Sequence, residues 1–313
     1  MTAPFLVLAF VAIFGGSGAI NVEVTITNGT LIGEKIDVDA NGTIFQLDRF
    51  LGIPYAKPPV GSLRFRRPVL LGEKWSKPRQ AISWPNNCVQ RKMFADRYRN
   101  GNFTEDCLYL NVWSPDVKDS NLRPVLVWIH GGSFYIGGSS FDLYNGEMLS
   151  AKADAVIVTI NYRVSTLGFL YSDEVTNIRG NQGMWDQAMA LRWVKENIRQ
   201  FGGDPDKITI MGESAGSQSV SLHILSPISR DLFANAIMMS GSALMKVVLK
   251  PEEMVKDFLF GIRQIGCAQV ADRKISKKVV DCLMKMDPEK LDNVTHFIRN
   301  KIGLSNYYFF LHF

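Results

Sequence analysis

Residues 207–220, KITIMGESAGSQSV, place a serine between two glycines at the end of a short apolar run. KITIM is typical of a buried strand and AGSQSVSLHILS of a helix, so Gly212–Gly216 must form the turn that joins them. A sharp strand-to-helix turn presents the serine hydroxyl at the carboxyl edge of a sheet, and the glycines leave room for the tight backbone and a substrate. The pattern makes Ser214 a candidate nucleophile, and the N–H of Ala215 can face a developing oxyanion.

A second glycine-rich turn, His130-Gly131-Gly132-Ser133-Phe134, follows the apolar run VLVWI at 125–129. Turns of this kind supply the other backbone N–H groups of the oxyanion hole in lipases and esterases. The turn precedes the G-x-S-x-G pattern in the chain, which is the order that this chemistry requires. The pair of motifs therefore favours acyl transfer through a serine over two ordinary tight turns.

The apolar runs that surround these turns predict a doubly wound, mostly parallel α/β sheet. Continuous apolar stretches at 125–129, 155–160, 207–211 and 235–240 alternate with helical segments, as strands buried on both faces do. The N-terminal portion differs, because period-2 alternation in NVEVTIT and two β-rich runs (32–38 and 44–51) predict antiparallel strands joined by Asn-Gly turns.

Three helices are expected from apolar periodicity and from their end signals. The first carries apolar residues at steps of three and four from Met184 to Phe201 and stops at FGGDP. The second follows Pro251, and the third begins at Asp287 as N-cap with Pro288 at the first helical position.

The composition is that of a folded globular protein, and its N-terminal segment predicts secretion. The chain has 313 residues, of which 46% are hydrophobic and 21% charged. Residues 1–19 contain an apolar stretch from Phe5 to Phe14 followed by small residues, which predicts a cleaved signal peptide and no stable membrane span after cleavage. Residues 20–313 are then expected to form one catalytic-type domain, secreted to the extracellular space.

Cysteines and sequons fit the same compartment. An even number of cysteines suits two disulfides; three pairings are open, and local pairing of Cys88 with Cys107 and of Cys267 with Cys282 is the simplest. Glycosylation is expected at four N-x-[ST] sites, namely Asn28, Asn41, Asn102 and Asn293. The formal net charge of +5 is spread along the chain, which argues against nucleic acid as a partner.

Five segments together resemble the type-B carboxylesterase and cholinesterase family of the α/β-hydrolase fold. The resemblance covers residues from about 22 to about 300. The segments are EDCLYLNVWSP (105–115), HGGSFYIGG (130–138), INYRVSTLGFL (160–170), GNQGMWDQAMALRWVKENIRQFGGDP (180–205) and GESAGSQSVSLHILSP (212–227).

The resemblance implies that Ser214 forms the acyl-enzyme and that backbone N–H groups of Gly132, Ser133 and Ala215 build the oxyanion hole. Ser133 stands where the family usually has a third glycine. The resemblance also supports the local disulfides. It implies a small-molecule carboxylic ester as substrate and no metal or organic cofactor.

Choline esters are expected less than other esters. The resemblance places a choline-binding tryptophan inside the first disulfide loop, where this chain has Phe94, Tyr98 and Phe103 but no Trp between Cys88 and Cys107. Without that ring, selection for a quaternary ammonium group loses its main support.

Ser214 needs a histidine to take its proton and an acid to orient that histidine. The resemblance places both well beyond residue 313, so the C-terminal part of the fold is expected to be missing and this chain is expected to be inactive. His130, His223, His296 and His312 are not expected to substitute. The alternatives are a non-catalytic, neuroligin-like binding or adhesion protein and a pseudoenzyme that sequesters esters.

Overall fold

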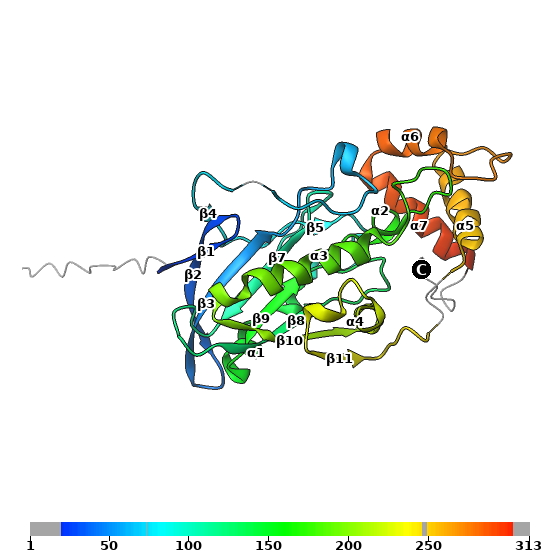
Figure 1. Ribbon diagram of the computed structural model, residues 1–313. Coiled ribbons are helices and arrows are strands. Elements are labelled where there is room, and N and C mark those ends of the chain that lie inside the picture. Colours follow the sequence, from blue (N-terminus) through cyan, green and yellow to red (C-terminus); the bar gives the residue numbers. More distant parts are fainter. Residues whose placement is uncertain (1–19, 73, 246–248, 303–313) are drawn as a thin grey trace, which may run out of the picture.

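The computed structural model describes residues 20–72, 74–245 and 249–302 (Figure 1). The strands are β1 (Asn21–Ile26), β2 (Gly29–Asp39), β3 (Ile44–Pro54), β4 (Arg79–Gln80), β5 (Asn87–Cys88), β6 (Phe103–Thr104), β7 (Tyr109–Ser114), β8 (Arg123–Ile129), β9 (Val156–Ile160), β10 (Gly203–Glu213) and β11 (Asn235–Met239). The helices are α1 (Glu147–Ala153), α2 (Ser165–Phe169), α3 (Gln182–Asn197), α4 (Ala215–Leu225), α5 (Pro251–Gln264), α6 (Lys277–Lys285) and α7 (Pro288–Ile302).

One large mixed sheet carries the fold, in the order β1-β2-β3-β7-β9-β8-β10-β11, with β4 beside β2. The pairs from β1 to β9 along this order are antiparallel. The pairs β9–β8, β8–β10 and β10–β11 are parallel. The antiparallel N-terminal portion and the parallel strands after residue 123 are therefore both present.

The Asn-Gly dipeptides lie at the hairpin turns of the antiparallel portion. Asn41 and Gly42, between β2 and β3, have φ of 60° and 82°, the positive values that a type I′ hairpin turn requires. Asn28 lies between β1 and β2, and Gly29, at the first position of β2, has φ of 136°. Both hairpins follow from residues that tolerate positive φ.

Alternating side chains of the central strands fill two apolar layers. Val125, Val127 and Ile129 of β8 belong to the main core, together with Leu191 and Val194 of α3. On alternate positions, Leu126 packs with Trp113, Ala155 and Ile157 in a smaller cluster. Figure 1 shows α3 lying across one face of the sheet. The continuous apolar runs thus reflect burial on both faces.

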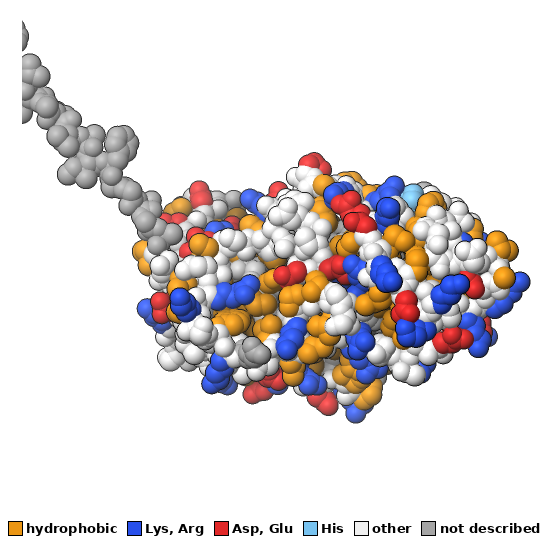
Figure 2. Space-filling model, turned by 90° about the horizontal axis from the view of Figure 1, so that it is seen from above, with side chains coloured by type: hydrophobic (Ala, Val, Ile, Leu, Met, Phe, Trp, Pro, Cys, Tyr) orange, Lys and Arg blue, Asp and Glu red, His pale blue; other side chains and the backbone are white. Residues whose placement is uncertain are grey.

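The edge strand β11 is much less covered than the centre of the sheet. Among the described residues it pairs only with β10, and Ile237 and Met238 are 44% and 48% exposed. On the face that Figure 2 shows, basic, acidic and hydrophobic side chains are interspersed. An open edge with apolar side chains is a template for pairing with another strand.

The helical ends follow the expected signals. Pro251 is the first residue of α5, and the Asp287 carboxylate accepts hydrogen bonds from the N–H groups of Glu289 and Lys290 at the start of α7. Disulfides join Cys88 to Cys107 and Cys267 to Cys282, as the local pairing predicts. Over the described ranges, no helix combines the length and apolar character that crossing a membrane requires. The expected signal segment, residues 1–19, lies outside the described residues.

Candidate active site

Ser214 occupies a strained position at the junction of β10 and α4. Its φ of 56° and ψ of −121° lie in a region that residues with a β-carbon avoid. Its N–H donates to the carbonyl of Met239, and its carbonyl accepts from Gln218 in the first turn of α4. Its side chain does not cap α4, and its hydroxyl makes no hydrogen bond with the described part of the chain.

Close backbone approach explains the glycines around this serine. A β-carbon on Gly131 would lie 2.5 Å from the Glu213 carbonyl oxygen and 3.4 Å from the Ser214 β-carbon. A β-carbon on Gly216 would lie 2.1 Å from the Ile129 carbonyl oxygen. Both distances to backbone oxygen are far below van der Waals contact, so larger residues would separate the two glycine-rich turns. The structure therefore brings together the two motifs that the sequence singled out.

Three backbone N–H groups near the turns are available to a ligand. Those of Gly132, Ser133 and Ala215 donate no hydrogen bond to another group in the described ranges. The turn itself is tight, because the N–H groups of Tyr135 and Ile136 both donate to the Gly132 carbonyl. Ser133 has φ of 56°, the left-handed region that favours glycine. Of these residues, Ala215 is buried, whereas Gly132 and Ser133 are half-buried.

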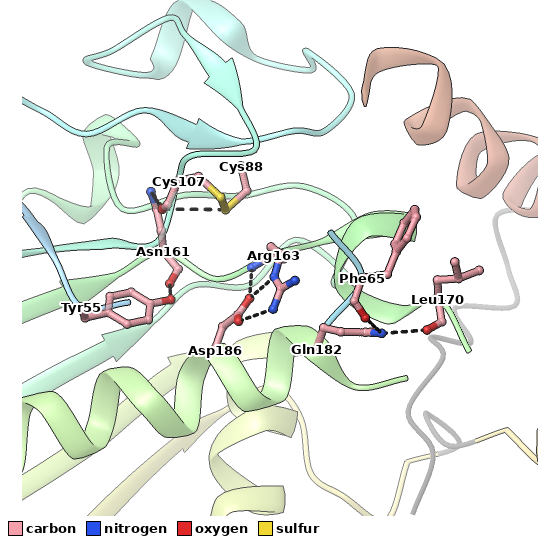
Figure 3. A network of polar contacts seen from close by, with 9 residues as sticks. All are labelled: Tyr55, Phe65, Cys88, Cys107, Asn161, Arg163, Leu170, Gln182 and Asp186. Atoms are coloured by element: carbon pink, nitrogen blue, oxygen red, sulfur yellow. Dashed lines mark hydrogen bonds and ion pairs between the residues drawn. A yellow bond between two sulfur atoms is a disulfide. The ribbon is translucent and has the colours of Figure 1, made fainter. Parts of the chain in front are cut away.

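The segment after β9 supports the glycine-rich turn at residues 130–134, the oxyanion turn, from a neighbouring strand. The Tyr162 hydroxyl donates to the His130 carbonyl at 2.7 Å, and the Asn161 side chain accepts from the Ser139 N–H at 2.7 Å. Next in the chain, Arg163 makes a two-bond ion pair with Asp186 of α3. Figure 3 shows the side chains of Arg163 and Asp186 facing each other. The turn is therefore anchored through α3.

The side chain of His130, the first residue of the oxyanion turn, contacts that turn and its neighbour Tyr162. Its ring stacks on Tyr162 with centroids 4.2 Å apart, and Nδ1 lies 2.9 Å from the Gly131 carbonyl. Burial lowers the pKa of His130 to about 4. The imidazole is neutral at physiological pH, and its Nε2 has no partner among the described residues.

The other described histidines are also engaged. His223 contacts Ser229 Oγ through Nδ1 and Gln187 Oε1 through Nε2, and burial lowers its pKa to about 4. His296 Nε2 lies 3.1 Å from the Asn300 amide on the same helix. None of the three forms a hydrogen bond with Ser214, and His312 lies outside the described residues.

The four predicted glycosylation sites differ in exposure. Asn41 and Asn102 are exposed, and Asn28 and Asn293 are half-buried, with Asn293 accepting a hydrogen bond from Arg91. Within the ranges that the structure describes, no three metal-ligating side chains lie together.

Sequence reasoning did not find Asn161, Tyr162 and Ser165, which are hydrogen-bonded to the segment 130–139, or Asp292, which is bonded to Ser165. The last two form a buried hydrogen bond, Ser165 Oγ to Asp292 Oδ1, at 2.8 Å. These residues are 127 positions apart, so no local signal could have linked them. A polar residue directly after a buried strand was the one available hint for Asn161.

Comparison with known proteins gives consistent matches. The model of the carboxylesterase family matches residues 21–310, somewhat further along the chain than the quoted motifs reach. Acetylcholinesterase 1 of Caenorhabditis elegans is 40% identical over 273 residues, 83% of this chain and 43% of that protein. Cholinesterase of Mus musculus is 43% identical over 258 residues, which are 80% of this chain and 42% of that protein. Acetylcholinesterase of Gallus gallus is 45% identical over 228 residues, which are 70% of this chain and 29% of that protein. The chain thus spans less than half the length of these relatives.

Proposed function

The chain belongs to the carboxylesterase family, and on this premise we propose that it carries the acyl-transfer half of a serine esterase site. The observation that supports the proposal is the strained Ser214 beside three unpaired N–H groups. A binding protein has no need of a serine held in a costly backbone conformation.

In the proposed reaction, Ser214 Oγ attacks the carbonyl carbon of a carboxylic ester. The carbonyl oxygen becomes an anion that the N–H groups of Gly132, Ser133 and Ala215 stabilise. The C–O bond to the alcohol then breaks, the proton lost by Ser214 passes to the leaving alcohol, and an acyl-serine remains. Water attacks this acyl-serine and releases the acid.

None of His130, His223 and His296 is hydrogen-bonded to Ser214, so we place the proton acceptor outside the described residues. This observation favours a second candidate for the 313-residue chain by itself: a protein that binds esters at the Ser214 turn and hydrolyses them very slowly. An adhesion role is a third possibility that would dispense with Ser214 altogether.

The substrate class that we propose is an uncharged small carboxylic ester. The relatives are cholinesterases, but the loop between Cys88 and Cys107 contains no tryptophan. Its aromatics are partly used elsewhere, because Tyr98 packs edge-on against both Phe103 and Phe141. A quaternary ammonium group gains most from an indole face, so its recognition is weakened.

Secretion and glycosylation at Asn28, Asn41, Asn102 and Asn293 form part of the same proposal. Both disulfides suit an oxidising compartment, in which such bonds form and persist.

The experiment compares hydrolysis of phenyl acetate and acetylthiocholine by the purified chain and by its Ser214→Ala variant. Without a base at Ser214, an oxyanion hole and binding alone leave roughly 10³- to 10⁴-fold acceleration over water. We expect slow turnover of phenyl acetate that exceeds acetylthiocholine turnover, with an acetyl group on Ser214 that peptide mass spectrometry detects in the chain and not in the variant. Acetyl transfer to another residue, or acetylthiocholine turnover as fast as that of phenyl acetate, would contradict the proposal.

A further inference from the structure

We propose that α7 clamps the oxyanion turn and that Asp292 is the positioning residue of this clamp. The proposal extends the proposed function, because it assigns a residue that controls where the N–H of Ser133 points. It concerns a helix that is remote in sequence from both glycine-rich turns.

A polar stripe on α7 carries the contacts. Asp292, Thr295 and Arg299 follow each other at steps of three and four and therefore share one face of the helix. Asp292 Oδ1 accepts from Ser165 Oγ at 2.8 Å, and Thr295 Oγ1 lies 2.7 Å from Thr166 Oγ1 at the start of α2.

The third residue of the stripe reaches the turn itself. The guanidinium carbon of Arg299 lies 4.7 Å from the ring centroid of Tyr135, which is part of the HGGSFYIGG segment. A cation over a tyrosine ring at this distance is attractive. The stripe thus contacts both the oxyanion segment and the residues that support it.

Ser165 transmits the contact from Asp292 to the oxyanion turn. Its N–H donates to the Phe134 carbonyl at 2.7 Å, one residue after Ser133. Ser165, Ser133 and Phe134 all have positive φ, at 59°, 56° and 52°. Non-glycine residues keep this conformation only where the surroundings over-determine it, and Asp292 supplies one of the bonds that do so.

Burial makes the bond between Ser165 and Asp292 difficult to replace. The two residues are 3% and 5% exposed, and Thr166 and Thr295 are completely buried. When one partner of a buried hydrogen bond is removed, the other loses its bond without gaining water. Loss of the Asp292 carboxylate should therefore release Ser165 and the turn that depends on it.

A different face of α7 holds the helix in place. Leu291, Val294 and Ile298 are buried in the main core, and Gly261 of α5 approaches Val294 so closely that a β-carbon there would lie 2.5 Å from its carbonyl oxygen. This apolar packing does not use Asp292. The helix should therefore stay folded when Asp292 is changed, which separates positioning from general stability.

The test is amide hydrogen exchange, followed by mass spectrometry, on the whole chain and on four variants. Asp292→Ala removes the acceptor, Asp292→Asn keeps an acceptor of the same shape, and Ser165→Ala removes the donor. Glu289→Ala is the matched control, because Glu289 lies on the same helix and its exposed side chain pairs, among the described residues, only with Lys92.

We expect exchange of the peptide containing residues 130–138 to accelerate about 10-fold or more in Asp292→Ala and in Ser165→Ala. Asp292→Asn and Glu289→Ala should leave it near the original rate. Unchanged exchange at 130–138 in both truncated variants, or equal acceleration in Glu289→Ala, would overturn the clamp. If Asp292→Ala does not fold, Ser165→Ala alone decides the question.

Labelling of Ser214 by a fluorophosphonate gives the functional readout in the same set. A clamp that positions the Ser133 N–H predicts slower labelling in Asp292→Ala, with rescue in Asp292→Asn. Failure of the proposed function would abolish labelling in every protein yet leave the exchange difference intact. Failure of the clamp would leave labelling equal in all variants.

Discussion

Replacement of Ser214 by glycine should stabilise the protein, although the side chain has the environment of a functional residue. The φ of 56° and ψ of −121° cost about 1–3 kcal/mol for a residue with a β-carbon, and glycine adopts them freely. Against this, glycine gives the unfolded chain more conformational freedom, which lowers the free energy of unfolding by about 0.5–1 kcal/mol. The hydroxyl makes no hydrogen bond to the described residues, so its loss costs little. The net expectation is a free energy of unfolding that rises by about 0.5–2 kcal/mol.

Urea unfolding of the original chain, Ser214→Gly and Ser214→Ala at one pH measures this difference. Ser214→Ala keeps the strain and should differ little from the original chain. Ser221→Gly is the matched control, because Ser221 lies inside α4, where glycine should lower the free energy of unfolding by about 0.5 kcal/mol. A Ser214→Gly variant no more stable than Ser214→Ala would refute the idea that strain is stored at this serine.

Three further predictions concern the buried carboxyl of Asp292, the buried ion pair of Arg163 with Asp186, and the exposed edge of β11. Burial raises the pKa of Asp292 to about 6, so the folded state binds a proton at this carboxyl between about pH 4 and pH 6, where the unfolded chain does not. The free energy of unfolding should therefore fall by up to about 3 kcal/mol as pH rises through that window. Urea unfolding of Asp292→Asn should show no such fall. Arg163→Met leaves the Asp186 carboxylate buried without its ion pair and should lower the free energy of unfolding by about 3–5 kcal/mol. The double variant with Asp186→Leu should recover most of this loss. Equal losses in the single and the double variant would argue against a stabilising pair. Met238→Lys should reduce aggregation, measured by light scattering, without lowering the urea midpoint, because a charge blocks strand pairing at the open edge of β11. Unchanged aggregation would show that this edge does not cause it.

Much of the fold could be predicted because its signals are local. Continuous apolar runs mark strands buried on both faces, and β8 and β9 lie where these runs predict. β11 also lies at its apolar run, but the prediction of burial on both faces is wrong there, because β11 is the last strand of the described sheet and its side chains are largely exposed. Pro251 and Asp287 mark helix starts through the chemistry of unpaired N–H groups. The two glycine-rich turns lie together because their strands, β8 and β10, are parallel neighbours.

Other features depend on contacts that no local pattern records. β10 begins at Gly203, earlier than its apolar run, because Gly203 pairs with Arg123 of β8. The short helix α1 has little apolar periodicity and packs mainly through Ala151. The bond between Asp292 and Ser165 exists only because tertiary packing brings α7 against α2. The supports of the oxyanion turn are therefore a result of the folded structure.

The dependence of Ser214 phosphonylation on pH tests the central claim most directly, namely that the described chain presents a nucleophile and an oxyanion hole but no base. The measurement follows fluorophosphonate labelling of the 313-residue chain between pH 5 and 9, with peptide mapping and Ser214→Ala as control. We predict slow labelling confined to Ser214, with a rate that rises with pH throughout and shows no plateau above the ordinary histidine pKa of about 6.5. A rate that levels off near pH 7, at the speed of an activated serine, would show that an imidazole already reaches Ser214.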